Sequence, residues 1–409
     1  MEKLRKGGVC VAKGFTAGGI HAGIKKDPAK KDLAIIYCEK KCNAAAIYTN
    51  NKVKAAPITV TKKHLFDNQA QAIIVNSGNA NACTANGTEV AEKMCELTAK
   101  ALGIAKEDVI VASTGVIGQE LNTGPLEKAI PELSENLSKA GTDDAGEAIM
   151  TTDTYMKTCS SKFELTCGTK CRIGGIAKGS GMINPDMGPQ ATMLAFITTD
   201  VNITPKMLKQ ALCEVNEKTF NMICVDGDTS TNDMVCILAS GMSGNREINT
   251  DSYDYIWFVD ALYTVMVHLA IEIAQDGEGA TKLLECVVKG APDKHTAKSV
   301  AKTVISSSLV KAALGAADAN WGRILCAIGY SEGEFDINKV EVAISSVKGN
   351  VIVCKDGRGV AFSEKQATEI LSEKEVDIFI NLNSGTQSAV AWGCDLTEEY
   401  IRINADYRS

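Results

Sequence analysis

A threonine stands where a loop rich in glycine and proline changes into an apolar strand. Residues 178–200 read KGSGMINPDMGPQATMLAFITTD, and the β-branched, apolar run begins at Thr192. Such a run predicts a buried strand, so the Thr192 hydroxyl would be presented at the end of a rigid element. It could simply mark the start of the strand. It could also be a nucleophile if the Ala191–Thr192 bond is cut, because a free α-amine titrates near ~7.7–8.0 and could act as the base for the hydroxyl beside it.

A second candidate lies in residues 109–118, VIVASTGVIG, which predict a strand that breaks into a turn at Thr114 and Gly115. One interpretation is a plain strand-to-loop turn, and local sequence alone favours it. The other interpretation is an oxyanion hole. Glycine lets the backbone approach closely, and a main-chain N–H together with the Thr114 hydroxyl could face a developing negative charge.

Several polar loops could contact a ligand or could only shape the backbone. Thr151 and Thr152 belong to a loop of hydroxyls with one acid, and Glu278 lies between two glycines on a turn that could project its side chain into a cleft. The acidic turn 226–233 could suggest a divalent cation, but it lacks the remote bidentate glutamate of a calcium loop. We therefore favour carboxylates that accept hydrogen bonds at this turn, and we predict no metal site.

The elements that must position these residues alternate irregularly, with many antiparallel hairpin signals. This order predicts an α/β fold of mixed layers in two lobes. Expected strands include 34–37, 45–48, 58–61, 72–75, 109–113, 162–166, 171–176, 192–199, 221–225, 233–240, 282–289, 324–328, 340–344, 351–354 and 378–381. Expected helices are 88–102, 126–139, 144–150, 204–219, 255–275, 296–314 and 367–371. The tail 400–409 alternates apolar positions and predicts a last strand that ends inside the fold.

Composition excludes some classes of partner. The 409 residues suffice for two domains, and 43 basic against 50 acidic residues give a net charge of −7, which argues against nucleic acid or an anionic membrane. The N-terminus shows no apolar run of a signal peptide, and 15 scattered cysteines indicate reduced thiols, so we expect a cytoplasmic protein. The apolar segment 255–274 carries two acids and a histidine, which predicts a half-buried helix instead of a membrane span.

Nine stretches, taken together and in order, resemble the self-processing glutamate N-acetyltransferases of arginine biosynthesis. These enzymes are also called ornithine acetyltransferases, or the ArgJ family. The stretches are NSGNANACT at 76–84, STGVIG at 113–118, MTTDT at 150–154, GGIAKGSGMI at 174–183, ATML at 191–194, NMICVDGDTSTND at 221–233, DGEGATK at 276–282, NWGRI at 320–324 and RINADYRS at 402–409. Together they cover nearly the whole chain, which is much more specific than any single motif.

The resemblance implies a two-lobed, self-processing fold with the nucleophile at the start of a buried strand. It implies a cut between Ala191 and Thr192, which would give an α chain of 1–191 with the oxyanion hole and a β chain of 192–409 with the nucleophile. These chains would assemble as an α2β2 heterotetramer. Thr192 would be the nucleophile, and Thr114 and Gly115 the oxyanion hole. The residues implied to contact substrate are Thr151, Thr152, Lys178, Thr192, Glu278, Asn404 and Ser409.

The implied reaction moves the acetyl group of N2-acetylornithine to glutamate through an acetyl-threonine. Lys178 could pair with a carboxylate, Glu278 with an ammonium group, and Asn404 with either polar end. Such a ping-pong path needs no metal and no cofactor. Acetyl-CoA is a possible co-substrate for making N-acetylglutamate directly.

Two other functions remain open from the sequence. The same nucleophile could serve an amidase or aminopeptidase that uses water as the acceptor. An uncleaved protein could instead bind amino acids or phosphates with its glycine-rich loops. One departure from the family is Gly188-Pro189-Gln190, which resembles an insertion just before the expected cut. A longer loop costs little closure entropy, but it bears on the geometry of self-cleavage.

Overall fold

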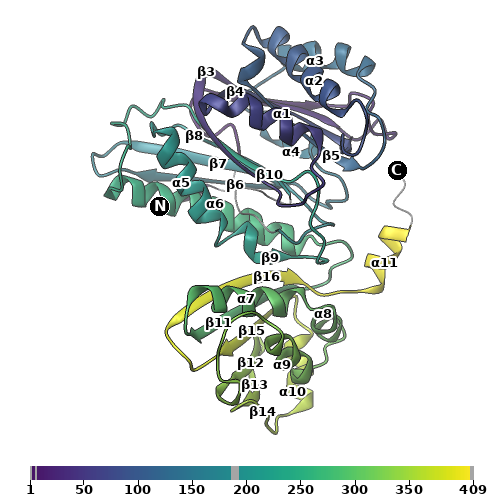
Figure 1. Ribbon diagram of the computed structural model, residues 1–409, viewed down its shortest axis with the longest axis vertical. Coiled ribbons are helices and arrows are strands. Elements are labelled where there is room, and N and C mark those ends of the chain that lie inside the picture. Colours follow the sequence, from purple (N-terminus) through teal and green to yellow (C-terminus); the bar gives the residue numbers. More distant parts are fainter. Residues whose placement is uncertain (1, 5–6, 186–192, 406–409) are drawn as a thin grey trace.

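The structure, a computed structural model, describes residues 2–4, 7–185 and 193–405. In this part of the chain two β-sheets lie one above the other, each flanked by helices (Figure 1). The predicted α/β architecture in two lobes is therefore confirmed.

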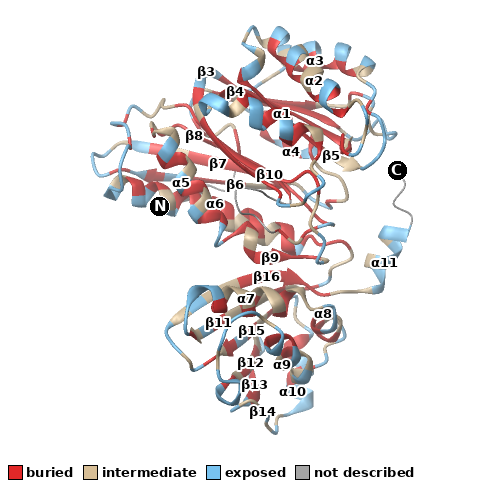
Figure 2. Ribbon diagram, in the orientation of Figure 1, coloured by how far each residue is buried: buried red, intermediate tan, exposed pale blue. Residues whose placement is uncertain are grey.

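The first sheet has the strand order β1-β6-β7-β8-β10-β3-β4-β5, with β2 paired to β3. Its strands are β1 (Glu2–Leu4), β2 (Phe15–Ile20), β3 (Leu33–Tyr48), β4 (Gln69–Asn79), β5 (Val109–Val116), β6 (Lys157–Glu164), β7 (Lys170–Lys178), β8 (Leu194–Thr199) and β10 (Met234–Ala239). Every residue of β8 and β10 is buried, as the continuous apolar runs predict (Figure 2). Because β8 and β10 lie between β7 and β3, this sheet contains strands from both sides of residue 192.

Helices cover both faces of the first sheet. Those packed on it are α1 (Ala56–His64), α2 (Gly87–Leu102), α3 (Gly124–Glu135), α4 (Thr142–Ala148), α5 (Pro205–Asn216) and α6 (Tyr253–Gln275). Helix α6 begins where the Ser252 side chain accepts a hydrogen bond from Tyr255 N, which satisfies a free N–H of the first turn. By length and apolar composition α6 could cross a membrane, but 44% of its most apolar window is buried against the fold. The predicted half-buried helix is confirmed.

The second sheet has the order β14-β13-β12-β15-β11-β16-β9. Its strands are β9 (Ile223–Cys224), β11 (Leu283–Ala291), β12 (Glu341–Ser346), β13 (Gly349–Lys355), β14 (Arg358–Gly359), β15 (Glu375–Asn381) and β16 (Gln387–Cys394). Its helices are α7 (Lys294–Ser306), α8 (Ser308–Gly315), α9 (Trp321–Gly329) and α10 (Glu364–Leu371). Helix α6 contacts β6 and β7 of the first sheet and also β9, β11 and β16 of the second, so one hydrophobic core continues through both lobes.

Four predicted elements differ in the structure. Residues 58–61 lie in α1, where a proline in the first turn favours a helix, and residues 324–328 lie in α9, which Asn320 caps at Arg323 N. Both are short apolar runs, for which periodicity does not separate strand from helix. The helix expected over 296–314 is divided at Ser307, whose extended backbone ends α7 while its side chain caps α8.

The predicted last strand is also wrong over its described part. Residues 398–405 form α11 (Glu398–Ala405), and two glutamates in its first turn suit the positive end of a helix dipole. Residues 406–409 lie outside the described part of the chain. Short 3-10 turns complete the list of elements, at Leu65–Asp67, Lys106–Asp108, Phe220–Met222 and Ile337–Lys339.

Candidate active site

The described chain resumes at Met193, just before the start of β8 in the first sheet. Ala191 and Thr192 lie outside the described residues, but Met193 is described, and its carbonyl accepts a hydrogen bond of 2.7 Å from Met234 N. Leu194 pairs with Lys178 of β7 on one side and with Met234 of β10 on the other. The chain that follows Thr192 therefore enters the sheet directly beside Lys178.

The predicted oxyanion residues lie where β5 pairs with β4. Gly115 has a φ of +130°, and a Cβ placed there would lie 2.4 Å from the carbonyl carbon of Gly78. Only glycine fits this close approach of two backbones. The strand does not break into the predicted turn, because β5 continues to Val116 over an irregular pairing at Asn79. The Nζ of Lys178 lies 3.4 Å from Thr114 Oγ1, so the structure brings these two predicted residues together.

Asp153 links two of the predicted substrate-binding residues. Its Oδ2 accepts a hydrogen bond of 2.9 Å from Thr151 N and lies 4.0 Å from Lys178 Nζ. Its Oδ1 accepts from Gly179 N at 2.7 Å and from Lys157 Nζ at 2.7 Å. Burial raises the pKa of Asp153, but the charges of Lys178 and Lys157 outweigh it and hold the pKa at about 2. Asp153 is therefore a buried, ionised carboxylate.

Asp276, which follows residue 192 in the sequence, belongs to the same cluster as residues that precede it. Its Oδ2 lies 2.6 Å from Lys157 Nζ, and its carboxylate also accepts from the amide and the hydroxyl of Thr154. Its backbone carbonyl accepts from Ser180 Oγ at 2.6 Å. Because Asp276 follows α6 while the other partners precede residue 192, a buried chain of charges joins the two segments.

Glu278 and Asn404 form a hydrogen bond next to the segment that follows Lys178. Asn404 Nδ2 of α11 donates to Glu278 Oε2 at 2.7 Å, and Glu278 N donates to the Ser180 carbonyl at 3.0 Å. Glu278 is 8% exposed, so it is not the fully solvated turn acid that local sequence favours. Its carboxyl group packs so closely on Gly181 that a Cβ there would lie 2.3 Å away. Ser409, predicted to bind substrate beside Asn404, lies outside the described residues.

Comparison of the sequence with known families gives a match over nearly the whole chain. Residues 16–409 match the ArgJ family. The chain belongs to the ArgJ family. The arginine biosynthesis bifunctional protein ArgJ of Caldanaerobacter subterraneus subsp. tengcongensis is 46% identical over 408 residues, covering 100% of each chain. The bifunctional protein ArgJ 1 of Clostridium acetobutylicum is 50% identical over 396 residues, covering 97% of this chain and 96% of that one.

A solved structure supports the same relationship. The crystal structure of the arginine biosynthesis bifunctional protein argJ from Bacillus halodurans matches with a TM-score of 0.50 and 47% sequence identity. The match covers 53% of this chain and 100% of the crystallised chain. The family named for these relatives is therefore the family that the sequence motifs predict.

Two titratable groups of this ArgJ-family site are strongly perturbed. Burial lowers the pKa of Lys178, and Asp153 partly offsets that effect by favouring the ammonium. Burial raises the pKa of Asp233 well above its usual range, and within the described residues its Oδ2 has no hydrogen-bond partner. Asp233 precedes β10 and faces the same Lys178 charge. Burial therefore makes Asp233 hold its proton more strongly than an exposed aspartate does, and sequence reasoning did not assign this residue to the site.

The acidic turn 226–233 behaves as the hydrogen-bonding interpretation predicts. Asp226 accepts hydrogen bonds from the backbone N–H groups of Met182 and Ile183 at 2.6 and 2.9 Å. These bonds hold the glycine-rich segment after Lys178 against the turn. Within the described residues, no group of three or more His, Cys, Asp or Glu side chains gathers as it would around a metal ion.

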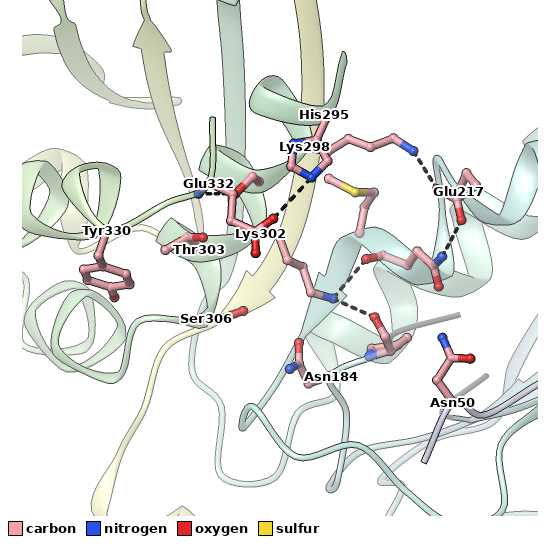
Figure 3. Close-up of a pocket in the computed structure, with 14 residues that line it drawn as sticks. Asn50, Asn184, Glu217, His295, Lys298, Lys302, Thr303, Ser306, Tyr330 and Glu332 are labelled. Carbon is pink, nitrogen blue, oxygen red and sulfur yellow. Dashed lines mark hydrogen bonds and ion pairs between the residues drawn. The ribbon is translucent and has the colours of Figure 1, made fainter. Parts of the chain in front are cut away.

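A cavity of about 660 Å³ lies apart from these residues, between α7 and the end of α5 (Figure 3). Four of its side chains form two pairs: Lys298 lies 2.7 Å from Glu217, and His295 lies 3.2 Å from Glu332. None of the residues predicted to bind substrate lines it. The described residues that the resemblance implies to contact substrate therefore lie outside this cavity.

Proposed function

We propose that the protein transfers the acetyl group of N2-acetylornithine to glutamate, giving ornithine and N-acetylglutamate. The observation that carries this proposal is the position of Lys178. It pairs with Leu194, two residues after the predicted nucleophile, while its ammonium lies 3.4 Å from the hydroxyl of Thr114. The names of the full-length relatives support the same reaction sequence, since each is called an arginine biosynthesis protein.

In the first half-reaction, Oγ of Thr192 attacks the acetyl carbonyl and its proton passes to the free α-amine of the same residue. Lys178 donates to Thr114 Oγ1, which leaves the hydroxyl hydrogen of Thr114 to face the oxyanion together with the Gly115 N–H. The amide C–N bond then breaks, and the leaving amine of ornithine takes the proton back from the α-amine. An acetyl ester of Thr192 remains.

In the second half-reaction, the amine of glutamate attacks this ester. The α-amine of Thr192 takes a proton from the attacking amine while the same two donors stabilise the oxyanion. The C–O bond to Thr192 then breaks, and that proton passes to the Thr192 oxygen. In this proposal Glu278, which accepts a hydrogen bond from Asn404, binds the side-chain ammonium of ornithine, and Lys178 with Thr151 binds a substrate carboxylate. Thr152 lies half-buried in the same loop as Thr151 and is a further proposed contact.

Self-cleavage between Ala191 and Thr192 is part of this proposal, because only a cut frees the amine that acts as the base. One comparison supports it. The complete Bacillus halodurans chain matches 53% of this one, and the 218 residues of 192–409 are 53% of the 409. The two products would form an α2β2 heterotetramer in the cytoplasm. The relatives' description as bifunctional favours a second reaction, acetylation of glutamate by acetyl-CoA.

The decisive experiment combines fragment analysis with an assay. A denaturing gel of purified protein should show two fragments. N-terminal sequencing of the C-terminal fragment should give Thr-Met-Leu. N-acetylornithine with glutamate should give N-acetylglutamate much faster than water releases acetate, which separates a transferase from an amidase. Thr192→Ala should leave one full-length, inactive chain. A Thr192→Ala protein that is still cut and still active would contradict the proposal.

A further inference from the structure

Lys25 is a cation beside the proposed site that none of the family's implied roles uses. Its Nζ donates hydrogen bonds of 2.8 Å to the carbonyls of Lys31 and Met150. Met150 directly precedes Thr151. The Lys25 stem lies against Gly78, where an added Cβ would approach its Cγ to 3.1 Å, and Gly78 pairs with Gly115. Lys25 therefore lies between the proposed oxyanion strand and the Thr151 loop.

Asp32 is a carboxylate that acts on the charge of Lys25, but its oxygens already have other hydrogen-bond donors. Asp32 already accepts three backbone hydrogen bonds, from Ala22, Ile24 and Lys25 itself, and lies 3.3 Å from His21 Nδ1. Within the described residues, Lys25 Nζ donates two hydrogen bonds, both to neutral carbonyls. An ammonium group has three N–H donors, so one donor remains for a ligand.

Lys178 is linked to the same loop through Asp153. The path between the two lysines is short: Lys25 contacts the Met150 carbonyl, Thr151 N donates to Asp153 Oδ2, and that oxygen lies 4.0 Å from Lys178 Nζ. Burial lowers the pKa of Lys25 to about 8, and the positive charge of Lys178 contributes to this shift. Two ammonium groups that repel each other in a half-buried site favour an anion between them.

We propose that Lys25 binds the carboxylate that the acetyl donor and the acceptor share, together with Thr151 and Lys178. This inference rests on the proposed function, because it assumes that Thr151 and Lys178 face the substrate. A carboxylate has two acceptor oxygens, so it can accept hydrogen bonds from Lys25, Lys178 and the Thr151 hydroxyl together. Both N-acetylornithine and glutamate carry this group, so Lys25 would act in both half-reactions.

The test measures KM and kcat from pH 6 to 10 for Lys25→Met, Lys25→Arg and the neighbouring exposed control Lys26→Met. Lys25→Met should raise KM for both substrates roughly 10- to 100-fold, the effect of one charge-assisted hydrogen bond, with a smaller change in kcat. Lys26→Met should behave as the wild type. The wild-type KM should rise as pH passes about 8, because Lys25 then loses its proton.

Other charged groups also influence the rise in KM near pH 8. The Lys25→Arg variant therefore decides whether Lys25 causes that rise. Groups that act on the Lys25 charge are Asp32, Lys30, Lys178 and Asp153. Arginine keeps its charge beyond pH 12, so Lys25→Arg should bind both substrates and should lack the rise in KM near pH 8. A purely structural role would lower the unfolding temperature and leave that rise in place. If Lys25→Met does not fold, Lys25→Arg alone still decides, since a retained rise near pH 8 would overturn the inference.

Lys178→Met, measured in the same series, separates two kinds of failure. If Lys178→Met weakens both substrates and Lys25→Met does not, only the role of Lys25 is wrong. If neither changes KM, the proposed substrate site itself is misplaced. Support requires that both substitutions raise KM and that Lys25→Arg remove the pH step.

Discussion

Lys157 lies 2.7 Å from the carboxylate of Asp153, and neither side chain is exposed to solvent. A second carboxylate, Asp276, lies 2.6 Å from the same ammonium, and Lys178 lies 4.0 Å from Asp153 on the other side. The result is a buried row of alternating charges that ends at the proposed oxyanion residue Thr114. The carboxylate of Asp153 positions the ammonium of Lys178, and this ammonium in turn orients the Thr114 hydroxyl.

The first prediction concerns Asp153→Asn, which keeps the size of the side chain and removes its charge. We expect kcat to fall on the order of 10²-fold, because a displacement of about 1 Å in a site can cost that much. The negative charge of Asp153 raises the pKa of Lys178, so its removal should let Lys178 lose its proton at lower pH. The alkaline limb of the kcat/KM profile should therefore move toward lower pH.

The matched control for that substitution is Asp395→Asn. Asp395, just after β16, is also a buried carboxylate, and it accepts backbone hydrogen bonds from Thr281 and Lys282 at 2.8 and 2.9 Å. It should lose stability without moving the pH profile. If Asp153→Asn also only lowered stability, a positioning role for Asp153 would be excluded.

The second prediction is a loss of stability in Lys157→Met. Methionine fills similar space, but it leaves the carboxylates of Asp153 and Asp276 buried without their shared partner. Breaking a buried ion pair from one side typically costs about 3–5 kcal/mol, which urea unfolding would measure. The exposed pair of Lys218 and Glu214 offers the control, since Lys218→Met should cost less than ~1 kcal/mol.

The same cluster predicts how stability depends on acid. The pKa of Asp153 is held at about 2 in the folded protein and is near 3.9 in an unfolded chain. Its contribution to the free energy of unfolding is therefore complete above about pH 4 and is lost as pH falls toward 2. In Asp153→Asn this part of the acid dependence should disappear. An unchanged slope between pH 4 and 2 would contradict the assignment.

The fourth prediction concerns Gly115→Ala. A methyl group there would lie 2.4 Å from the carbonyl carbon of Gly78, and backbone cannot rotate away as a side chain can. The β4–β5 pairing must shift, so we expect kcat to fall on the order of 10²–10³-fold, as when one oxyanion donor is lost. Gly118→Ala is the control: it also has a positive φ, of 80°, but its Cβ would meet nothing within 4 Å. It should lose some stability and keep its activity.

The sequence predicts best where burial alone decides the structure. The run after Thr192 is apolar from Met193 to Ile197 and ends in two β-branched threonines, and β8 is buried at every position. The hairpin of β6 and β7 is similarly predicted, because Gly168 with a φ of +80° supplies the turn between two apolar runs. By contrast, residues 58–61 suit a strand by composition and form a helix, since the structure around a short run can override its propensity.

The sequence does not predict the charge row behind the site. Asp276 and Lys157 are 119 residues apart, and Lys178 and Thr114 are 64 apart, so only the sheet order brings them together. Locally, Asp153 resembles an ordinary loop acid and Lys157 an ordinary strand lysine. A weak signal was present in the acid of the Thr151–Thr154 loop, but nothing in its neighbours indicates full burial. The resemblance to a family supplied Lys178 and Asn404, and it favoured a binding role for Glu278, which its place between two glycines had left open.

The last prediction concerns Glu278→Gln and the donor substrate. Glutamine can still accept the hydrogen bond from Asn404 Nδ2, which is 2.7 Å in length, so the local structure should persist while the negative charge is lost. We expect KM for N-acetylornithine to rise roughly 10- to 100-fold, because a hydrogen bond to a charged group contributes about 1.5–3 kcal/mol. N-acetylnorvaline, which has the same chain length and no terminal amine, should react equally slowly with both proteins. Glu399→Gln, at an exposed position beside Arg402, should change neither substrate. If both donors lost the same factor in Glu278→Gln, the carboxylate would not be the partner of the ornithine ammonium.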